Sequence, residues 1–132
     1  MIDQNQIYFA PHLYIPGGVT DISFYEKAFD AVELKRLNNE DGTVHVAELT
    51  IDGALFHIHE DKITAGQYSP SKINGTTALI GLFVPDVDSV MAKAVNAGGT
   101  VVSPAKTYDY GYRQGEIRDP FGHVWLIEKK TT

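Results

Sequence analysis

Apolar and polar residues alternate along several short stretches of the chain, a pattern typical of half-buried β-strands. These stretches are residues 7–15, 33–37, 44–51, 54–59, 77–84, 101–102, 112–118 and 123–128. Residues 20–29 and 87–96 instead carry apolar side chains at helical spacing. Thr20 or Asp21 is placed to cap the first of these helices, and Gly98 and Gly99 to end the second. The chain is therefore predicted to mix strands with two helices.

The predicted elements occur twice in the same order. YIPGG at residues 14–18 is repeated as FVPDV at 83–87, EKAFDA at 26–31 as AKAVNA at 92–97, and GALFHI at 53–58 as GHVWLI at 122–127. Each half predicts a strand, a helix and three more strands. The predicted fold class is α+β, built from tandem βαβββ modules.

The predicted organisation is a single domain over residues 1–132. The first module spans about residues 7–60 and the second about 76–129, joined by a polar, turn-rich surface linker at 61–75. A module of about 65 residues would be marginally stable alone. We therefore expect the two modules to pack together.

Strand alternation divides the predicted sheet residues between two faces. The apolar face comprises Phe9, Leu13, Ile15, Phe56, Ile58, Ala78, Ile80, Leu82, Val84, Trp125 and Ile127. The other face comprises Tyr8, His12, Tyr14, Leu55, His57, His59, Thr77, Gly81, Phe83, Val124, Leu126 and Glu128. Helices should cover the first face, whereas aromatic walls with a few polar groups favour a ligand cavity on the second. The alternative is that the second face forms one wall of a dimer interface.

Composition and missing motifs exclude several classes of function. A net charge of -6 argues against nucleic-acid binding, and no apolar run approaches the length that crosses a bilayer. With no cysteine, the chain has no disulfide, thiolate metal site or cysteine nucleophile. Hydrolase, nucleotide-binding and zincin motifs are also absent. A cytoplasmic location is expected.

The repeat, together with SFYEKAFDA, VPDVDSVMAKAVNAGGTVV and YGYRQGEIRDPFGHVWLI, resembles the vicinal oxygen chelate superfamily. This superfamily includes glyoxalase I, bleomycin-resistance proteins and extradiol dioxygenases, and the chain is most similar to its PhnB-like branch. The resemblance implies the glyoxalase/bleomycin-resistance fold, in which two modules form a curved mixed sheet around a cleft. It also implies a homodimer.

The resemblance further implies where a divalent metal would bind, with one ligand from the first and fourth strands of each module. In this sequence the fourth-strand positions are His57 and Leu126, and the first-strand positions fall near Ala10 and Leu79. Leucine cannot bind a metal, so we expect no metal cofactor. The alternative is a displaced site formed by His12, His57 and Glu128, with His59 close by.

Two further groups of residues are candidates for chemistry. Glu48 and Glu116 hold matching places in the two modules and are candidate catalytic acids or bases, or else strand carboxylates paired with Arg113 or Arg118. Tyr108, Tyr110 and Tyr112 with Arg113 predict a rim that stacks on planar ligands, or else a surface hairpin. His45 and His123 receive no predicted role.

The sequence as a whole favours a protein that binds a small organic molecule in an aromatic cleft without the usual metal. The predicted ligand-binding residues are Tyr8, His12, Tyr14, His57, His59, Phe83, Tyr110, Arg113 and Glu128. Two alternatives stay open. One is a metal-dependent lyase, isomerase or dioxygenase, and the other is a dimeric scaffold with a vestigial pocket.

Overall fold

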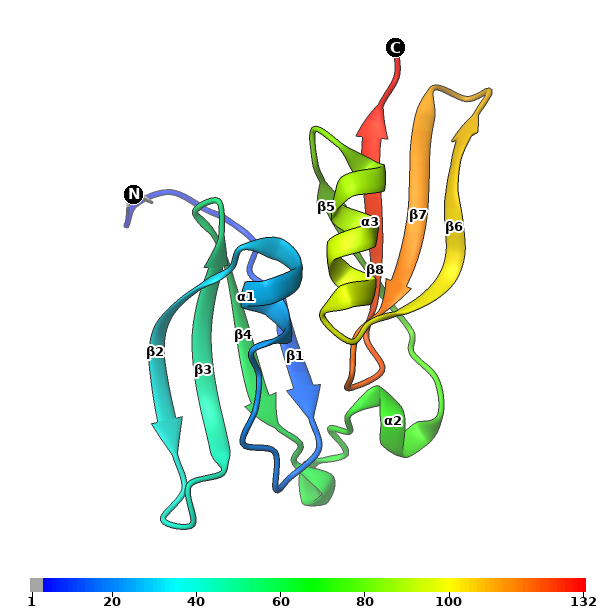
Figure 1. Cartoon of the computed structure of the whole chain (residues 1–132). Helices are drawn as coiled ribbons and strands as arrows, with labels where there is room; N and C mark the ends of the chain where they lie inside the picture. Colours follow the sequence, from blue (N-terminus) through cyan, green and yellow to red (C-terminus); the bar gives the residue numbers. More distant parts are fainter. Residues whose placement is uncertain (1–3) are drawn as a thin grey trace.

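A computed structural model describes residues 4–132, so the first three residues of the predicted domain lie outside the described part (Figure 1). The first half contains β1 (His12–Ile15), α1 (Phe24–Phe29), β2 (Val32–Asn38), β3 (Val44–Ile51) and β4 (Ala54–Glu60). The connection contains a 3-10 turn, η1 (Ile63–Ala65), and α2 (Pro70–Ile73). The second half contains β5 (Leu79–Phe83), α3 (Val87–Asn96), β6 (Thr100–Tyr108), β7 (Tyr112–Arg118) and β8 (Val124–Lys130).

The two halves form two mixed four-stranded sheets with the same topology. Their strand orders are β1-β4-β3-β2 and β5-β8-β7-β6. In each sheet the first strand runs parallel to the fourth, and the remaining neighbours are antiparallel. The predicted fold class, an α+β fold of tandem βαβββ modules, is confirmed.

The helices α1 and α3 lie on the same side of the sheets, where they contact each other and cover the core (Figure 1). Leu13, Ile15 and Ile58 are buried on this side in the first half, as are Trp125 and Ile127 in the second. These residues belong to one hydrophobic cluster that runs through both halves. The two sheets therefore share a core and stabilise each other. This agrees with the expectation that one module alone would be only marginally stable.

The first strand is shorter than the sequence predicted. It begins at His12 rather than residue 7, and Phe9, predicted to be covered, is 98% exposed. Pro11 has no backbone N–H to donate, and the partner strand β4 begins at Ala54, only three residues before the partner of His12. The chain upstream of Pro11 therefore has little strand to pair with.

Other boundaries also differ from the prediction. The first helix begins at Phe24 rather than residue 20, and Ala78 is exposed. The sixth strand continues to Tyr108 although Pro104 interrupts its alternation, because an edge strand with irregular pairing tolerates proline. Among residues 4–132, no helix has the length and apolar character needed to cross a membrane.

The predicted surface linker is partly buried. Ser69 is fully buried, and its hydroxyl lies 3.2 Å from the Asp61 carboxylate. The backbone N–H of Ser71 donates to the Phe121 carbonyl, so α2 packs against the turn between β7 and β8. The connection therefore helps to position the second half.

A buried carboxylate joins the two halves at this same turn. Oδ1 of Asp119 accepts hydrogen bonds from the backbone N–H groups of Phe121 and His123, at 2.9 and 3.0 Å. Its Oδ2 accepts from the Tyr25 hydroxyl of α1 at 2.7 Å and from the Trp125 indole at 3.0 Å. Burial and the Asp119 charge raise the pKa of Tyr25 well above its usual value, so this phenol remains a donor.

Replacing Asp119 by alanine should remove about 3 kcal/mol or more of the free energy of unfolding, because buried donors lose their acceptor. Denaturant unfolding followed by circular dichroism measures this loss. Asp41→Ala is the matched control, since Asp41 accepts from Thr43 in an exposed turn and should lose about 1 kcal/mol or less. Equal losses in the two variants would contradict a linking role for Asp119.

The start of β6 also depends on close packing. A Cβ at Gly99 would lie 2.8 Å from Cγ2 of Ile117 and 2.9 Å from the Ala94 carbonyl oxygen. We expect Gly99→Ala to lower the free energy of unfolding by about 1–3 kcal/mol. Gly17→Ala serves as the control, because an added Cβ there meets no described atom within 4 Å, and its midpoint in the same denaturant titration should stay unchanged.

Candidate functional site

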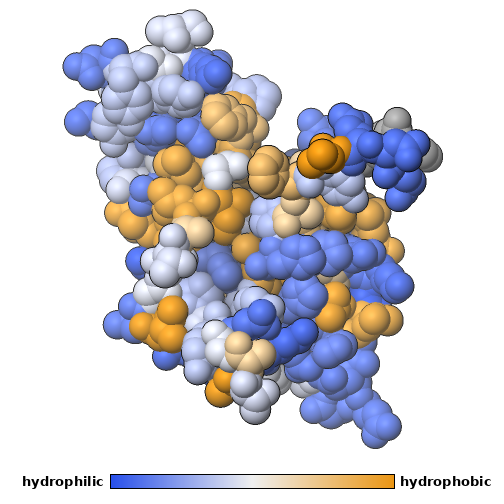
Figure 2. All heavy atoms as spheres, turned by 180° about the vertical axis from the view of Figure 1, so that it is seen from behind, coloured by the Kyte–Doolittle hydropathy of each residue, from blue (hydrophilic) through white to orange (hydrophobic). Residues whose placement is uncertain are grey.

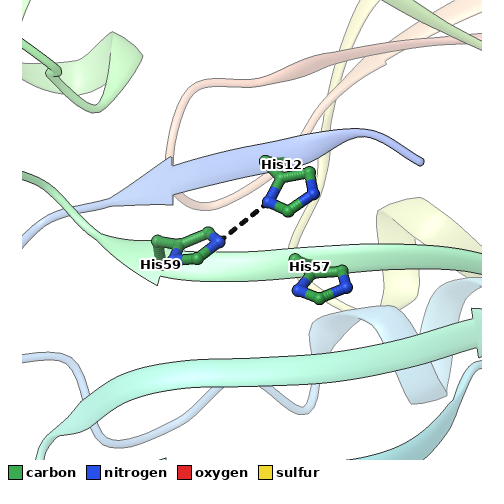
Figure 3. Close-up of side chains that lie close together, drawn as sticks. All are labelled: His12, His57 and His59. Carbon is green, nitrogen blue, oxygen red and sulfur yellow. Dashed lines mark hydrogen bonds between the residues drawn. The ribbon is translucent and has the colours of Figure 1, made fainter. Parts of the chain in front are cut away.

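The face of the first sheet away from the helices carries three histidines on two adjacent strands (Figure 3). His12 of β1 lies in register with His57 of β4, and Tyr14 with His59. Residues with the opposite parity, such as Leu13 and Ile58, are buried in the core. Strand alternation therefore presents all three imidazoles on the open side, as the sequence predicted.

The three rings form one compact group, called here the histidine cluster: His12, His57 and His59. His12 Nδ1 lies 2.9 Å from His59 Nε2 in a hydrogen bond (Figure 3). The rings of His12 and His57 stack with their centroids 4.3 Å apart. One ring nitrogen from each residue lies within 4.8 Å of those of the other two.

The environment of two of these rings, His12 and His59, favours the neutral imidazole. Burial lowers the pKa of His12, and the neighbouring His57 lowers it further. The pKa of His59 is likewise lowered by burial and then by His12 and His57. Nδ1 of His59 is buried, and within the described residues it has no hydrogen-bond partner. The cluster thus keeps ring nitrogens available for a further interaction.

The two predicted catalytic carboxylates lie on different sheets. Glu48 of β3 is in register with His57, and its Oε1 lies 3.8 Å from His57 Nε2. Glu116 of β7 is in register with Leu126, at the matching place in the second half. The structure therefore brings Glu48, but not Glu116, next to the histidine cluster.

On the open face of the second sheet, Glu128 is held among polar partners and is only 7% exposed. Its Oε1 accepts a 2.9 Å hydrogen bond from the Gln114 amide, whose own oxygen accepts from the Tyr110 hydroxyl. A Cβ at Gly81 would lie 2.7 Å from Oε2 of Glu128. The carboxylate therefore lies across β5 where a side chain at position 81 would be.

The tyrosines predicted to form either a rim or a surface hairpin lie near this carboxylate. The rings of Tyr108 and Tyr110 stack with centroids 5.1 Å apart, and Tyr112 contacts both Tyr110 and Phe83. Arg113 has the opposite strand parity and donates two hydrogen bonds to Asp88 of α3, on the helix side of the sheet. The structure therefore separates Arg113 from the tyrosines with which the sequence grouped it.

A groove of about 470 Å³ runs between the start of β1 and β5, next to the connection. Its walls include His12, Tyr68, Ile73, Leu79, Gly81 and His123. Figure 2 shows the face away from the helices, where apolar patches interrupt a mostly polar surface. Tyr8 precedes β1 and is half exposed, outside the walls of this groove.

Sequence reasoning missed three residues around these features. His123 is buried and its Nε2 donates a 2.7 Å hydrogen bond to the Tyr14 carbonyl, linking the second half to β1. Tyr68 lines the groove from the connection, and Gln114 holds Glu128. Only Gln114 had a signal in the sequence, since it alternates with Tyr112 and Glu116 along one strand.

Known proteins show the same sequence pattern and the same fold. An uncharacterised protein of Mycobacterium bovis is 40% identical over 121 residues, covering 89% of this chain and 80% of the relative. The structure of an Arabidopsis thaliana gene product has a TM-score of 0.69 at 25% identity, over 92% of this chain and 98% of that one. The fosfomycin resistance protein FosX of Listeria monocytogenes shares the fold, with a TM-score of 0.69 at 18% identity, over 99% of this chain and 96% of that one.

A family model matches most of the chain. The match covers residues 21–127, from just before α1 to the middle of β8, and so includes the elements of both halves except β1. It confirms the resemblance at the level of the superfamily. The chain belongs to the Glyoxalase/Bleomycin resistance protein/Dioxygenase superfamily.

Proposed function

We propose that this protein binds a small organic molecule in the groove between β1 and β5. The observation that carries the proposal is the groove of about 470 Å³, which has largely apolar walls and meets the histidine cluster at His12. Ligand pockets commonly have volumes of about 300–1,000 Å³, with a few polar groups that orient the ligand. The groove has this size and this mixture of walls.

The proposed recognition divides the ligand into two parts. Its apolar body would pack against Tyr68, Ile73 and Leu79, and a polar end would reach a ring nitrogen of His12. The exposed rings of Tyr110 and Phe83 supply further surface for a planar group. From the sequence prediction, the proposal retains Tyr14, His57, His59 and Glu128 as neighbours on the open faces.

A fluorescence titration with anilinonaphthalene sulfonate, in the presence of a chelator, tests the groove directly. We expect saturable binding, which small planar aromatic molecules displace. Leu79→Lys should weaken the affinity about tenfold or more, because an ammonium group would enter the apolar groove.

The control for this titration is Leu34→Lys. Leu34 on β2 is 58% exposed, close to the 52% of Leu79, but it does not line the groove. Unchanged binding in Leu79→Lys, or an equal loss in both variants, would refute the proposed site and favour a scaffold with a vestigial pocket.

A second candidate is a metal-dependent lyase, isomerase or dioxygenase, favoured by the histidine cluster and the neighbouring Glu48. A divalent metal, when bound, would supply Lewis-acid chemistry toward substrate oxygens. Glu48 is 38% exposed at its side chain and lies beside His57, so it is placed to accept or return a proton at the edge of the cluster.

The motifs quoted for the PhnB-like branch support assignment to that branch, and the composition supports a cytoplasmic location.

We also propose that the protein acts as a homodimer. Ile7 and Phe9 are 97% and 98% exposed on the segment that extends away from the start of β1 (Figure 1). Large apolar side chains exposed to this degree are costly in water, and a second copy of the chain would cover them.

Light scattering coupled to size-exclusion chromatography tests this association. The double variant Ile7→Asp, Phe9→Asp should elute as a monomer while the original chain elutes as a dimer. The control Ile63→Asp changes a half-exposed residue of η1 and should stay dimeric. A monomeric original chain would rule out the homodimer.

A further inference from the structure

We infer that His12, His57 and His59 form a divalent-metal site contained entirely in the first sheet. Metal-dependent members of the superfamily share four ligands between two modules. The site inferred here differs because β1 and β4 of one module supply all three protein ligands.

The shared four-ligand arrangement does not fit this chain. In the first half, the metal-binding position on β1 is His12. It lies in register with His57, whereas Ala10, the position expected from the sequence, precedes β1. The matching pair in the second half is Gly81 opposite Leu126. Neither glycine nor leucine has a side-chain donor for a metal. Two of the four ligands are therefore missing from the second half.

His59 supplies the ligand that the second half lacks. It follows His57 by two residues on β4, so both imidazoles project from the same face of one strand. Its Nε2 is already 2.9 Å from His12 Nδ1, and its buried Nδ1 has no partner among the described residues. Nε2 is the nitrogen that faces His12, so a metal between the rings would bind there, and a metal would satisfy the buried Nδ1 only if the ring turned over.

The spacing of the three rings is compatible with one ion. The donor nitrogens lie within 4.8 Å of one another. Imidazole nitrogens around a tetrahedral ion at about 2.1 Å are separated by about 3.4 Å. Rotation of the side chains about Cα–Cβ and Cβ–Cγ would have to supply this contraction.

The donor set indicates the class of metal. Three imidazoles suit zinc, cobalt, nickel or copper ions better than magnesium or calcium, which prefer oxygen ligands. Three protein ligands leave a coordination position for water or another molecule. Because His12 also lines the groove, that open position would be accessible from the groove. Glu128, the third ligand of the displaced site considered from the sequence, is instead engaged by Gln114.

Titration of chelator-treated protein with Co²⁺ tests the inference without any assay of activity. We expect visible absorption bands that saturate at one ion per chain, and a higher melting temperature when Zn²⁺ is added. His59→Gln should weaken Co²⁺ binding at least about tenfold, and His57→Gln should have the same effect. Circular dichroism checks that each variant is folded. If His59→Gln does not fold, the loss of Co²⁺ binding is measured in His57→Gln instead.

His45→Gln is the matched control. His45 lies on the first sheet and contacts Glu60, outside the histidine cluster, so its replacement should leave Co²⁺ binding unchanged. Glu128→Gln should also bind Co²⁺ as the original chain does. Failure of the original chain to bind at millimolar Co²⁺, or loss of binding in Glu128→Gln but not in His59→Gln, would overturn the inference. The groove titration contains a chelator, so its outcome is independent of this one.

Discussion

The Asp119 carboxylate is the interaction on which the arrangement of the two halves depends. It satisfies two backbone N–H groups of the turn before β8 and, at the same time, the Tyr25 hydroxyl of α1 and the Trp125 indole. An unpaired buried charge would be costly, so all four donors stabilise this geometry. The turn fixes the start of β8 and hence which residues of β8 face the core. Packing of Tyr25 against Trp125 and Phe56 extends the contact into both sheets.

The core lies between the helices and the sheets. Residues on the sheet faces away from the helices are therefore not needed to fill it. That division explains why polar residues such as His57 and Glu48 alternate with fully buried Ile58 and Leu49 on neighbouring strands. The same alternation in the second sheet places Gln114 and Glu128 opposite the buried Ile117 and Ile127. Function can therefore vary on one face while stability is maintained on the other.

Sequence alone was sufficient for features that depend on local periodicity. It predicted the duplicated order of elements, and it placed His12, His57 and His59 together on a face away from Leu13 and Ile58. It failed where a distant partner decides the outcome. The start of β1 depends on where β4 begins, and the role of His123 depends on the Tyr14 carbonyl 109 residues away. Such contacts leave no periodic signal in the chain.

The position of Glu128 over Gly81 has a consequence for substitutions on the open face of the second sheet. Any side chain introduced at position 81 would meet the carboxylate of Glu128, because its Cβ alone would lie 2.7 Å from Oε2. A metal-binding side chain at position 81 would therefore fit only if the Glu128 side chain moved aside and gave up its hydrogen bond from Gln114.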